Sequence, residues 1–374
     1  MLIKSNDVKF SQPRFLLLGG NGGKWKAADR PGGKAESNGI EAWCYAFTGD
    51  YSHSLSTGKG CIAGYDIVMI NLDYLAEPKQ FAHLIRLAGH CNSGTKLVAM
   101  IEGAAPDYIR PNPQLRELLA MCSLVNVINE PSLPYFRALT GTRAEFIGIP
   151  YPVESAAKYK VPFDARKKKA FLSSFLTSRY NDYLVARNPG LECFGFEQKI
   201  RRTVRRLYYN LSEFGTLRKY HMLEKAAGLF SDPALKIYPD LVFGEYLRAI
   251  SDSYLAVNLD YRYTWSRFVI DSAVLGIPMI TTKSTGHGPV FFPETTIDNH
   301  FQIGRAIELR DRLLDDKDFY RHVADYPADK LEWLKHENMK AKLMDCLIPA
   351  KAPEKQDYHP DSSDLLPEAA LGDK

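Results

Sequence analysis

Short apolar runs alternate with amphipathic stretches along the first half of the chain. The apolar runs predict strands at residues 15–18, 66–72, 97–101, 124–128 and 145–149. Between them, helical spacing of apolar residues predicts helices at 78–91, 113–122 and 132–140. Continuous apolar strands separated by helices indicate a parallel sheet with helices on both faces. The carboxyl ends of such strands share one edge of the sheet, where ligands bind.

The second half repeats this alternation after a segment that contains three prolines and a basic run. Strands are predicted at 170–175, 191–196, 234–237, 253–259 and 278–282. Helices are predicted at 179–186, 198–229, 244–250, 266–275, 301–315 and 329–347. We therefore expect a first domain at 1–150, a linker at 151–169, a second domain at 170–327, a helix at 328–348 that packs back on the first domain, and a disordered tail at 349–374. A cleft between two α/β domains is the expected ligand site.

Composition adds little to this picture. A chain of 374 residues exceeds what one core usually serves, and its net charge of +4 does not by itself mark a nucleic-acid binder. The six cysteines form no C-x-x-C pair, which favours a reduced, cytoplasmic compartment. We expect no transmembrane segment, because no apolar run reaches spanning length.

The stretch from Tyr246 to Thr295 carries the clearest chemical signal. It predicts a helix, a strand, a loop, the helix at 266–275, a Gly-Ile-Pro turn, a strand and a glycine loop. Ser266 is a good N-cap for the helix, whose first N–H groups and positive dipole end can bind a diphosphate. Arg267 can add paired hydrogen bonds to phosphate oxygens. The simpler alternative is an ordinary core-facing helix with Arg267 on the surface.

In this order, the stretch resembles the donor-binding core of GT-B glycosyltransferases, especially the retaining group called family 4, and more loosely the spore-maturation-type glycosyltransferases. Matching Gly276-Ile277-Pro278 to the family's G-x-P places Asp271 at the second glutamate of its E-x7-E motif and Tyr263 at the first. Trp265 then replaces a family aromatic residue, and Ser266 replaces a glycine. The resemblance implies two Rossmann-like domains that face each other across a cleft. It also implies sugar transfer from a nucleotide-diphosphate-sugar, which is a substrate rather than a cofactor.

The resemblance also implies which residues bind the donor. Asp271 takes the place of the acid that contacts the ribose, whereas Tyr263 lacks the carboxylate that lies near the transferred sugar. Arg179 matches one of the family's phosphate-binding basic residues, although the usual lysine after it is absent. The full set of expected donor-binding residues is Arg179, Tyr263, Thr264, Ser266, Arg267, Asp271 and His287.

The first domain offers a glycine loop and two carboxylates. Gly20, Asn21, Gly22 and Gly23 follow the first strand directly and can approach phosphates or an acceptor closely. The Gly-, Ser- and Lys-rich region that continues to Gly64 is expected to be a mobile lid or acceptor loop. A flexible loop without a ligand is the alternative for the glycines.

Glu102 and Asp73 end neighbouring strands at the expected cleft and are the catalytic candidates. An inverting enzyme needs one of them as a base, whereas a retaining enzyme needs none, and the sequence does not decide between these. No carboxylate cluster or Cys/His spacing indicates a metal, so we expect metal-independent transfer.

A basic, tyrosine-rich stretch leaves the acceptor open. Its charges lie largely off an apolar helical face and comprise Lys199, Arg201, Arg202, Arg205 and Arg206. This pattern fits a solvated surface helix, peripheral contact with an anionic surface, or nucleic acid. The acceptor can thus be a glycan, a lipid-linked molecule or a nucleic acid. The rival functions are a sugar-nucleotide epimerase, a GT-B-scaffold binding protein without catalysis, and a nucleic-acid-binding or DNA-modifying protein.

Overall fold

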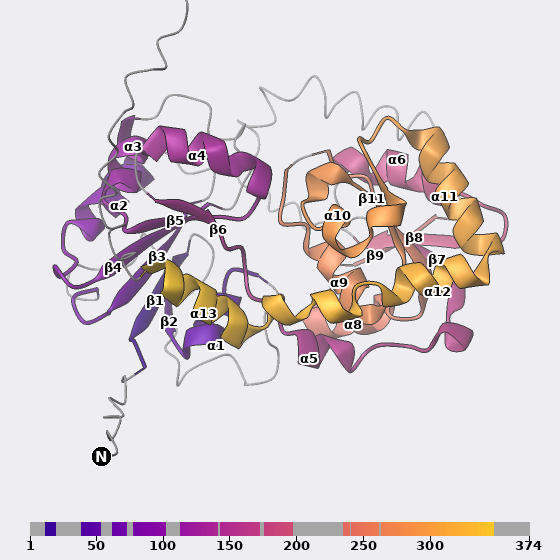
Figure 1. Cartoon of the computed structure of the whole chain (residues 1–374), viewed down its shortest axis with the longest axis horizontal. Coiled ribbons are helices and arrows are strands. Elements are labelled where there is room, and N and C mark those ends of the chain that lie inside the picture. The colour runs from indigo at the N-terminus through magenta and orange to yellow at the C-terminus, as the bar shows by residue number, and fades with distance from the viewer. Residues whose placement is uncertain are drawn as a thin grey trace, which may run out of the picture.

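The computed structural model describes residues 12–19, 39–53, 62–72, 78–101, 113–140, 143–172, 176–196, 235–239, 241–261 and 263–347. These residues form two α/β domains that lie side by side (Figure 1), each built on a parallel sheet of six strands. The predicted fold class, two Rossmann-like parallel-sheet domains, is confirmed. The predicted helix at 198–229 and the predicted tail at 349–374 lie outside the described residues.

The sheet of the first domain has the order β2-β1-β3-β4-β5-β6. Its strands are β1 (Phe15–Gly19), β2 (Asp50–His53), β3 (Ile67–Leu72), β4 (Lys96–Ile101), β5 (Leu124–Val127) and β6 (Ala144–Phe146). Its helices are α1 (Ala42–Phe47), α2 (Pro78–Ala88), α3 (Pro113–Ala120) and α4 (Leu133–Thr140). Strands β1, β3 and β5 are buried along their whole length, because helices cover both faces of the sheet.

Part of the predicted lid is folded, so that prediction was wrong for residues 39–53. This segment forms α1 and β2, and β2 pairs with the edge of β1. Trp43, Cys44 and Phe47 are buried, and the ring of Phe47 stacks on Phe15 with centroids 4.5 Å apart. Three apolar residues at helical spacing suffice to dock this short helix, although polar and glycine residues surround it. Residues 20–38 and 54–61 of the predicted lid lie outside the described part of the chain.

The sheet of the second domain has the order β12-β11-β10-β7-β8-β9. Its strands are β7 (Lys167–Leu172), β8 (Glu192–Phe196), β9 (Leu235–Tyr238), β10 (Ser253–Asn258), β11 (Met279–Thr282) and β12 (Thr296–Ile297). Its helices are α6 (Leu176–Ala186), α8 (Phe243–Ile250), α9 (Arg267–Leu275), α10 (Gly288–Phe291), α11 (Ile303–Asp315) and α12 (Lys317–Asp325). Strands β7, β8 and β9 follow one another toward one edge of the sheet, whereas β10, β11 and β12 follow one another toward the other edge. The strand order therefore reverses between β7 and β10, which are paired neighbours. Ligands of such sheets bind at the carboxyl ends of the strands near this reversal.

Two segments connect the domains. The outgoing connection contains the short helix α5 (Val153–Ala157) and a 3-10 turn at Phe163–Ala165, and β7 begins at Lys167 rather than at 170. The returning segment is not the continuous helix that we predicted at 329–347. Two 3-10 turns, Ala328–Lys330 and Glu332–Leu334, come first, and an extended Lys335 separates them from α13 (His336–Leu347).

Helix α13, drawn in yellow in Figure 1, lies against the first domain. The Lys340 ammonium lies 5.1 Å from the centre of the Phe47 ring, and Nη1 of Arg143 donates to the carbonyl oxygen of Cys346 at 2.9 Å. The chain therefore crosses between the domains a second time, and its last described helix packs on the first domain. Among the described helices, none is long and apolar enough to cross a membrane.

Candidate functional site

The loop between β10 and α9 begins at the carboxyl end of the central strand of the second sheet. Hydroxyl groups from the end of β11 hold it. Thr281 Oγ1 donates to the carbonyl of Asn258 at 2.9 Å, and Thr282 and Ser284 donate to the carbonyl of Asp260 at 2.5 Å each. The backbone N–H of Thr264 donates to the carbonyl of Ser284 at 3.3 Å. These bonds fix where α9 begins, and α9 lies on the side of its domain that faces the first domain (Figure 1).

Ser266 occupies the N-cap position of α9, but its hydroxyl does not cap the helix as we expected. Its backbone is left-handed, with φ +46° and ψ 71°, whereas side-chain capping needs an extended residue. The hydroxyl instead accepts a hydrogen bond from Nδ2 of the buried Asn258 at 2.9 Å. A left-handed residue other than glycine costs about 1–2 kcal/mol, and such strain gathers at functional sites. The family motif has a glycine at this position.

Trp265 lies at the junction of the two domains. Its indole ring is 6.1 Å from the ring of Phe146 at the end of β6 and 6.1 Å from that of Trp333 in the returning segment. The ring also covers Gly148, where an added Cβ would lie 2.0 Å from a ring carbon. Gly148 has φ +97°, so both its backbone and its surroundings require glycine. Trp265 therefore joins the predicted donor loop to the first domain.

Asp271 lies on α9 and is 1 % exposed. One of its oxygens accepts a hydrogen bond from Tyr151 at 2.5 Å, and the other accepts one from Tyr246 at 2.9 Å. Burial raises the pKa of both phenols well above the usual value, and the negative charge of Asp271 adds to this rise, while Arg267 opposes it. The carboxylate thus connects α9 to α8 and to the outgoing connection, where Tyr151 also donates its N–H to Leu334 at 2.8 Å.

His287 is 2 % exposed and packs among aromatic rings. Its ring meets that of Trp265 edge-on, with centroids 4.2 Å apart, and lies 5.8 Å from Trp333. Burial lowers the pKa of the imidazole from 6.5 to about 3, so the side chain is neutral at physiological pH. The structure therefore brings Thr264, Trp265 and His287 together behind the start of α9, while Tyr263 and Arg267 are exposed.

The remaining predicted residues lie outside the described side chains. Strands β1, β3 and β4 are neighbours in the sheet and end at Gly19, Leu72 and Ile101. The candidates that follow them directly, and lie outside the described residues, are Gly20, Asn21, Gly22, Gly23, Asp73 and Glu102. The backbone of Arg179 belongs to α6, but its side chain is not described, and the basic residues 199–206 lie outside the described ranges.

Asn129, which lies two residues beyond β5, is a site residue that the sequence pattern did not reveal. It is fully buried, and its side chain faces the turn at Gly286, where an added Cβ would lie 3.8 Å from the Asn129 Nδ2. The signal in the sequence was a pair of asparagines, with Asn126 inside an apolar strand and Asn129 just after it. Buried asparagines in such runs need hydrogen-bond partners, so their presence marks a specific local requirement.

A groove of about 310 Å³ opens on the second domain beside the end of β9. Aromatic rings of Phe194, Phe196 and Tyr238 line it, and Tyr238 is 41 % exposed. The ring of Phe196 lies 5.4 Å from that of Tyr246, which lies 6.4 Å from Phe268 in the first turn of α9. A continuous series of aromatic rings therefore leads from the groove to the start of α9.

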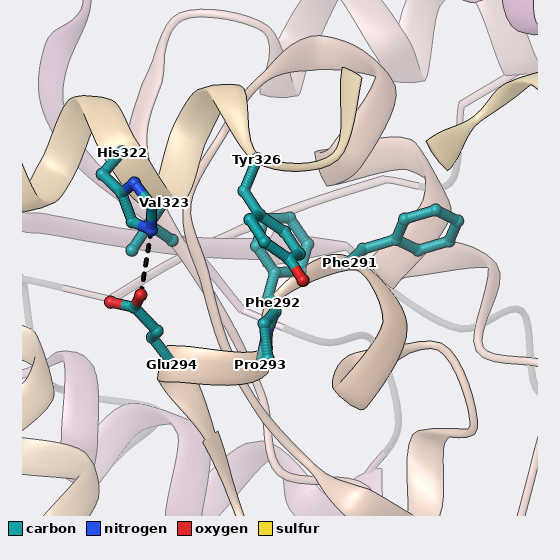
Figure 2. Close-up of a pocket in the computed structure, with 7 residues that line it drawn as sticks. All are labelled: Phe291, Phe292, Pro293, Glu294, His322, Val323 and Tyr326. Atoms are coloured by element: carbon teal, nitrogen blue, oxygen red, sulfur yellow. Dashed lines mark hydrogen bonds and ion pairs between the residues drawn. The ribbon is translucent and has the colours of Figure 1, made fainter. Parts of the chain in front are cut away.

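A second depression, shown in Figure 2, is too small for a substrate. Its volume is about 10 Å³, which suits about one water molecule. Phe292 and Tyr326 line it, and His322 Nε2 lies 2.9 Å from Glu294 Oε1 beside it. This depression is a packing feature between α10 and α12 and carries no site.

Comparison with solved structures decides the fold. HepE from Anabaena, in complex with UDP, superposes with a TM-score of 0.60 over 90 % of this chain and 99 % of its own, at 12 % identity. The UDP-forming α,α-trehalose-phosphate synthase from Burkholderia xenovorans superposes with a TM-score of 0.57 over 76 % of this chain and 73 % of its own, at 10 % identity.

The chain has the GT-B fold. The trehalose-6-phosphate synthase OtsA gives the same result, with a TM-score of 0.58 at 12 % identity over 76 % of this chain and 72 % of its own. The sequence matches no protein-family model and no curated protein. At these identities the likeness establishes architecture alone, and the specific similarity to family 4 stays a prediction.

Proposed function

We propose that this GT-B protein is a glycosyltransferase that transfers a sugar from a nucleotide-diphosphate-sugar, bound by the second domain, to an acceptor bound by the first. The observation that carries the proposal is the start of α9. There, a strained left-handed Ser266 opens a helix at the carboxyl edge of the central strand β10. In this fold, that place presents backbone N–H groups and a positive dipole end toward a ligand.

The donor diphosphate is proposed to lie at this helix start. Arg267 is exposed at the first helical position, where its positive charge opposes the helix dipole. The negative charge of a bound diphosphate would offset both the charge of Arg267 and the positive end of the helix dipole. The planar guanidinium can bind two of the diphosphate oxygens. Arg179, at the start of the second domain, is the proposed second phosphate ligand. Charge neutralisation by these groups suits metal-independent transfer.

The aromatic groove is proposed to bind the nucleoside base. Its volume of about 310 Å³ lies at the low end of ligand pockets, and it contains rings on which a planar base can stack. Asp271 remains the proposed ribose ligand, since a ribose hydroxyl can donate to a carboxylate oxygen. Because Asp271 is 1 % exposed, contact with the ribose requires movement around α9.

The acceptor is proposed to bind at the carboxyl edge of the first sheet. Gly20–Gly23, Asp73 and Glu102 follow three adjacent strands, β1, β3 and β4, so they are expected to share that edge. Glu102 or Asp73 would serve as general base in an inverting reaction. Closure of the two domains would bring the reactants together and exclude water.

The proposal is tested by incubating the protein with a panel of nucleotide sugars and candidate glycan acceptors and measuring release of the nucleoside diphosphate. Acceptor-dependent release supports a transferase. Tight binding without turnover supports the alternative, a GT-B scaffold without catalysis. The observation that favours this alternative is Tyr263, an exposed phenol where the family has the glutamate near the transferred sugar. Absence of binding by any nucleotide sugar would contradict both.

A further inference from the structure

Two asparagines at β5 are equally buried but differ in their hydrogen bonds. Asn126 and Asn129 are both 0 % exposed. The amide of Asn126 donates to the carbonyl of Gly148 at 2.9 Å and accepts from the Gly148 N–H at 2.9 Å. Neither Oδ1 nor Nδ2 of Asn129 has a hydrogen-bond partner in the part of the chain that the structure describes.

Buried polar atoms without a described hydrogen-bond partner also occur on the opposite side of the domain junction, in the second domain. Thr264 Oγ1, Trp265 Nε1 and His287 Nε2 are buried, and within the described ranges they have no hydrogen-bond partner. They lie close to one another and to Asn129. A Cβ added to Gly286 would lie 3.3 Å from the Thr264 carbonyl oxygen and 3.8 Å from the Asn129 Nδ2, and the rings of Trp265 and His287 are 4.2 Å apart.

Such a cluster is costly for a purely structural junction. Buried polar atoms in native proteins are nearly always hydrogen-bonded, and each exception destabilises the folded state. Within the described ranges, five such atoms belong to four side chains near the Gly286 turn, and both domains contribute them. A ligand-binding site can tolerate this loss of stability, because the bound ligand supplies the missing hydrogen bonds.

We propose that Asn129, Thr264, Trp265 and His287 form a binding site for the uncharged, hydroxyl-rich sugar of the donor. This inference rests on the proposed function. The amide and the hydroxyl both donate and accept, the indole donates, and Nε2 of the neutral imidazole donates or accepts according to its tautomer. A sugar hydroxyl also donates and accepts, so it can satisfy each of these groups. None of the four carries a charge, because burial also keeps His287 neutral.

The position of the cluster agrees with this assignment. Thr264 and Trp265 directly precede Ser266 and Arg267, so the sugar would lie next to the proposed diphosphate site. Asn129 adds a contribution from the first domain. Because these atoms are covered in this structure, the ligand reaches them when the domains separate at the contact of Asn129 with the Gly286 turn. The sugar would then connect the two domains on closure.

The test compares Asn129→Leu with the matched control Asn126→Leu in the full-length protein. We expect Asn129→Leu to leave the Tm of the ligand-free protein unchanged or raise it, because it removes polar atoms that have no hydrogen-bond partner among the described residues. Asn126→Leu should lower it, because the Gly148 N–H and carbonyl lose their partners. Titration calorimetry then measures the affinity for a nucleoside diphosphate and for its nucleotide sugar. Asn129→Leu should keep the first and lose about tenfold in the second.

Trp265→Phe carries the same test through the indole N–H if Asn129→Leu does not fold. The inference is overturned if Asn129→Leu lowers the Tm as much as Asn126→Leu does. It is also overturned if both variants at the cluster keep the wild-type ratio of the two affinities, while the proposed function then stands. If wild-type protein binds neither the diphosphate nor the nucleotide sugar, the proposed function fails and this inference fails with it.

Discussion

The hydroxyl of Tyr151 donates to a carboxylate oxygen of Asp271 at 2.5 Å, and this bond joins the connection between the domains to the helix that begins at the proposed donor site. Both side chains are buried, and the backbone N–H of Tyr151 donates to Leu334 in the returning segment. The two segments that cross between the domains and helix α9 therefore meet at one residue. Movement of α9 on ligand binding would be transmitted to both crossings.

Replacement of Asp271 by Ala should destabilise the protein. The substitution leaves the buried phenol of Tyr151 and the partly buried phenol of Tyr246 without this acceptor, and each unpaired buried donor costs about 1–3 kcal/mol. Chemical denaturation measures the free energy of unfolding. Tyr151→Phe in the Asp271→Ala background should recover part of the loss, because it removes one orphaned donor. An unchanged free energy of unfolding in Asp271→Ala would contradict this account of the contact.

His287 should make the protein sensitive to acid. Its pKa is about 3 in the folded protein and 6.5 in a solvated chain, so below pH 6.5 the unfolded state binds a proton that the folded state does not. The stability that His287 contributes is therefore complete above pH 6.5 and is lost between pH 6.5 and about 3, by up to about 1.4 kcal/mol per pH unit. His287→Phe should show a shallower loss in this window than wild type, measured by urea unfolding at several pH values. His322→Gln, which removes an exposed histidine, is the control, and identical slopes for His287→Phe and wild type would refute the prediction.

Replacement of Gly148 by Ala should disturb the domain junction. The new Cβ would lie 2.0 Å from the Trp265 ring, and the backbone has φ +97°. Strain and overpacking together should cost about 2–4 kcal/mol. Calorimetry checks the loss, and the fluorescence of Trp265 should shift because the ring must move. Gly94→Ala is the matched control, since its added Cβ meets nothing within 4 Å. Equal stability of the two variants would show that Trp265 does not pack on Gly148.

The aromatic groove gives a prediction about the nucleoside base. Tyr238 is 41 % exposed, so Tyr238→Ala should leave the Tm nearly unchanged. It should weaken binding of a nucleoside diphosphate about tenfold, because stacking of one base on an aromatic ring contributes about 1–3 kcal/mol. Tyr326→Ala, which removes a tyrosine of 37 % exposure beside the small depression, is the control. Wild-type affinity in Tyr238→Ala would exclude the groove as the base site.

The sequence predicted those parts of the fold that depend on local patterns. Continuous apolar runs marked ten of the twelve strands in the described ranges to within a few residues, because strands in a covered parallel sheet are apolar on both faces. Strand β2 and helix α1 were missed inside a polar, glycine-rich region. Helix α12 was also missed, although Asp316 caps it through bonds to the N–H groups of Asp318 and Phe319.

The candidate site was predictable only where it follows the order of elements along the chain. The start of α9 could be located from the sequence, because a strand, a loop and a Gly-Ile-Pro turn surround it. The bond between Tyr151 and Asp271 joins residues 120 positions apart, so it depends on how the linker packs against the second domain. The amide of Asn129, which has no partner in the described part of the chain, is likewise visible only once both domains are in place. The left-handed backbone of Ser266, which redirects its hydroxyl to Asn258, has no local sequence signal.

The most direct test of the central claim is titration of wild-type protein with a panel of nucleoside diphosphates, followed by thermal shift. Arg267→Gln is the test variant, and Arg305→Gln, an exposed arginine paired with Glu308 on α11, is the matched control. The account predicts that one diphosphate raises the stability of wild type, by about 2.7 kcal/mol at a hundredfold excess over its Kd. It also predicts that Arg267→Gln loses about tenfold or more in affinity while Arg305→Gln does not. A folded wild-type protein that binds no nucleoside diphosphate, or an Arg267→Gln variant that binds one as tightly as wild type, would contradict the proposed donor site.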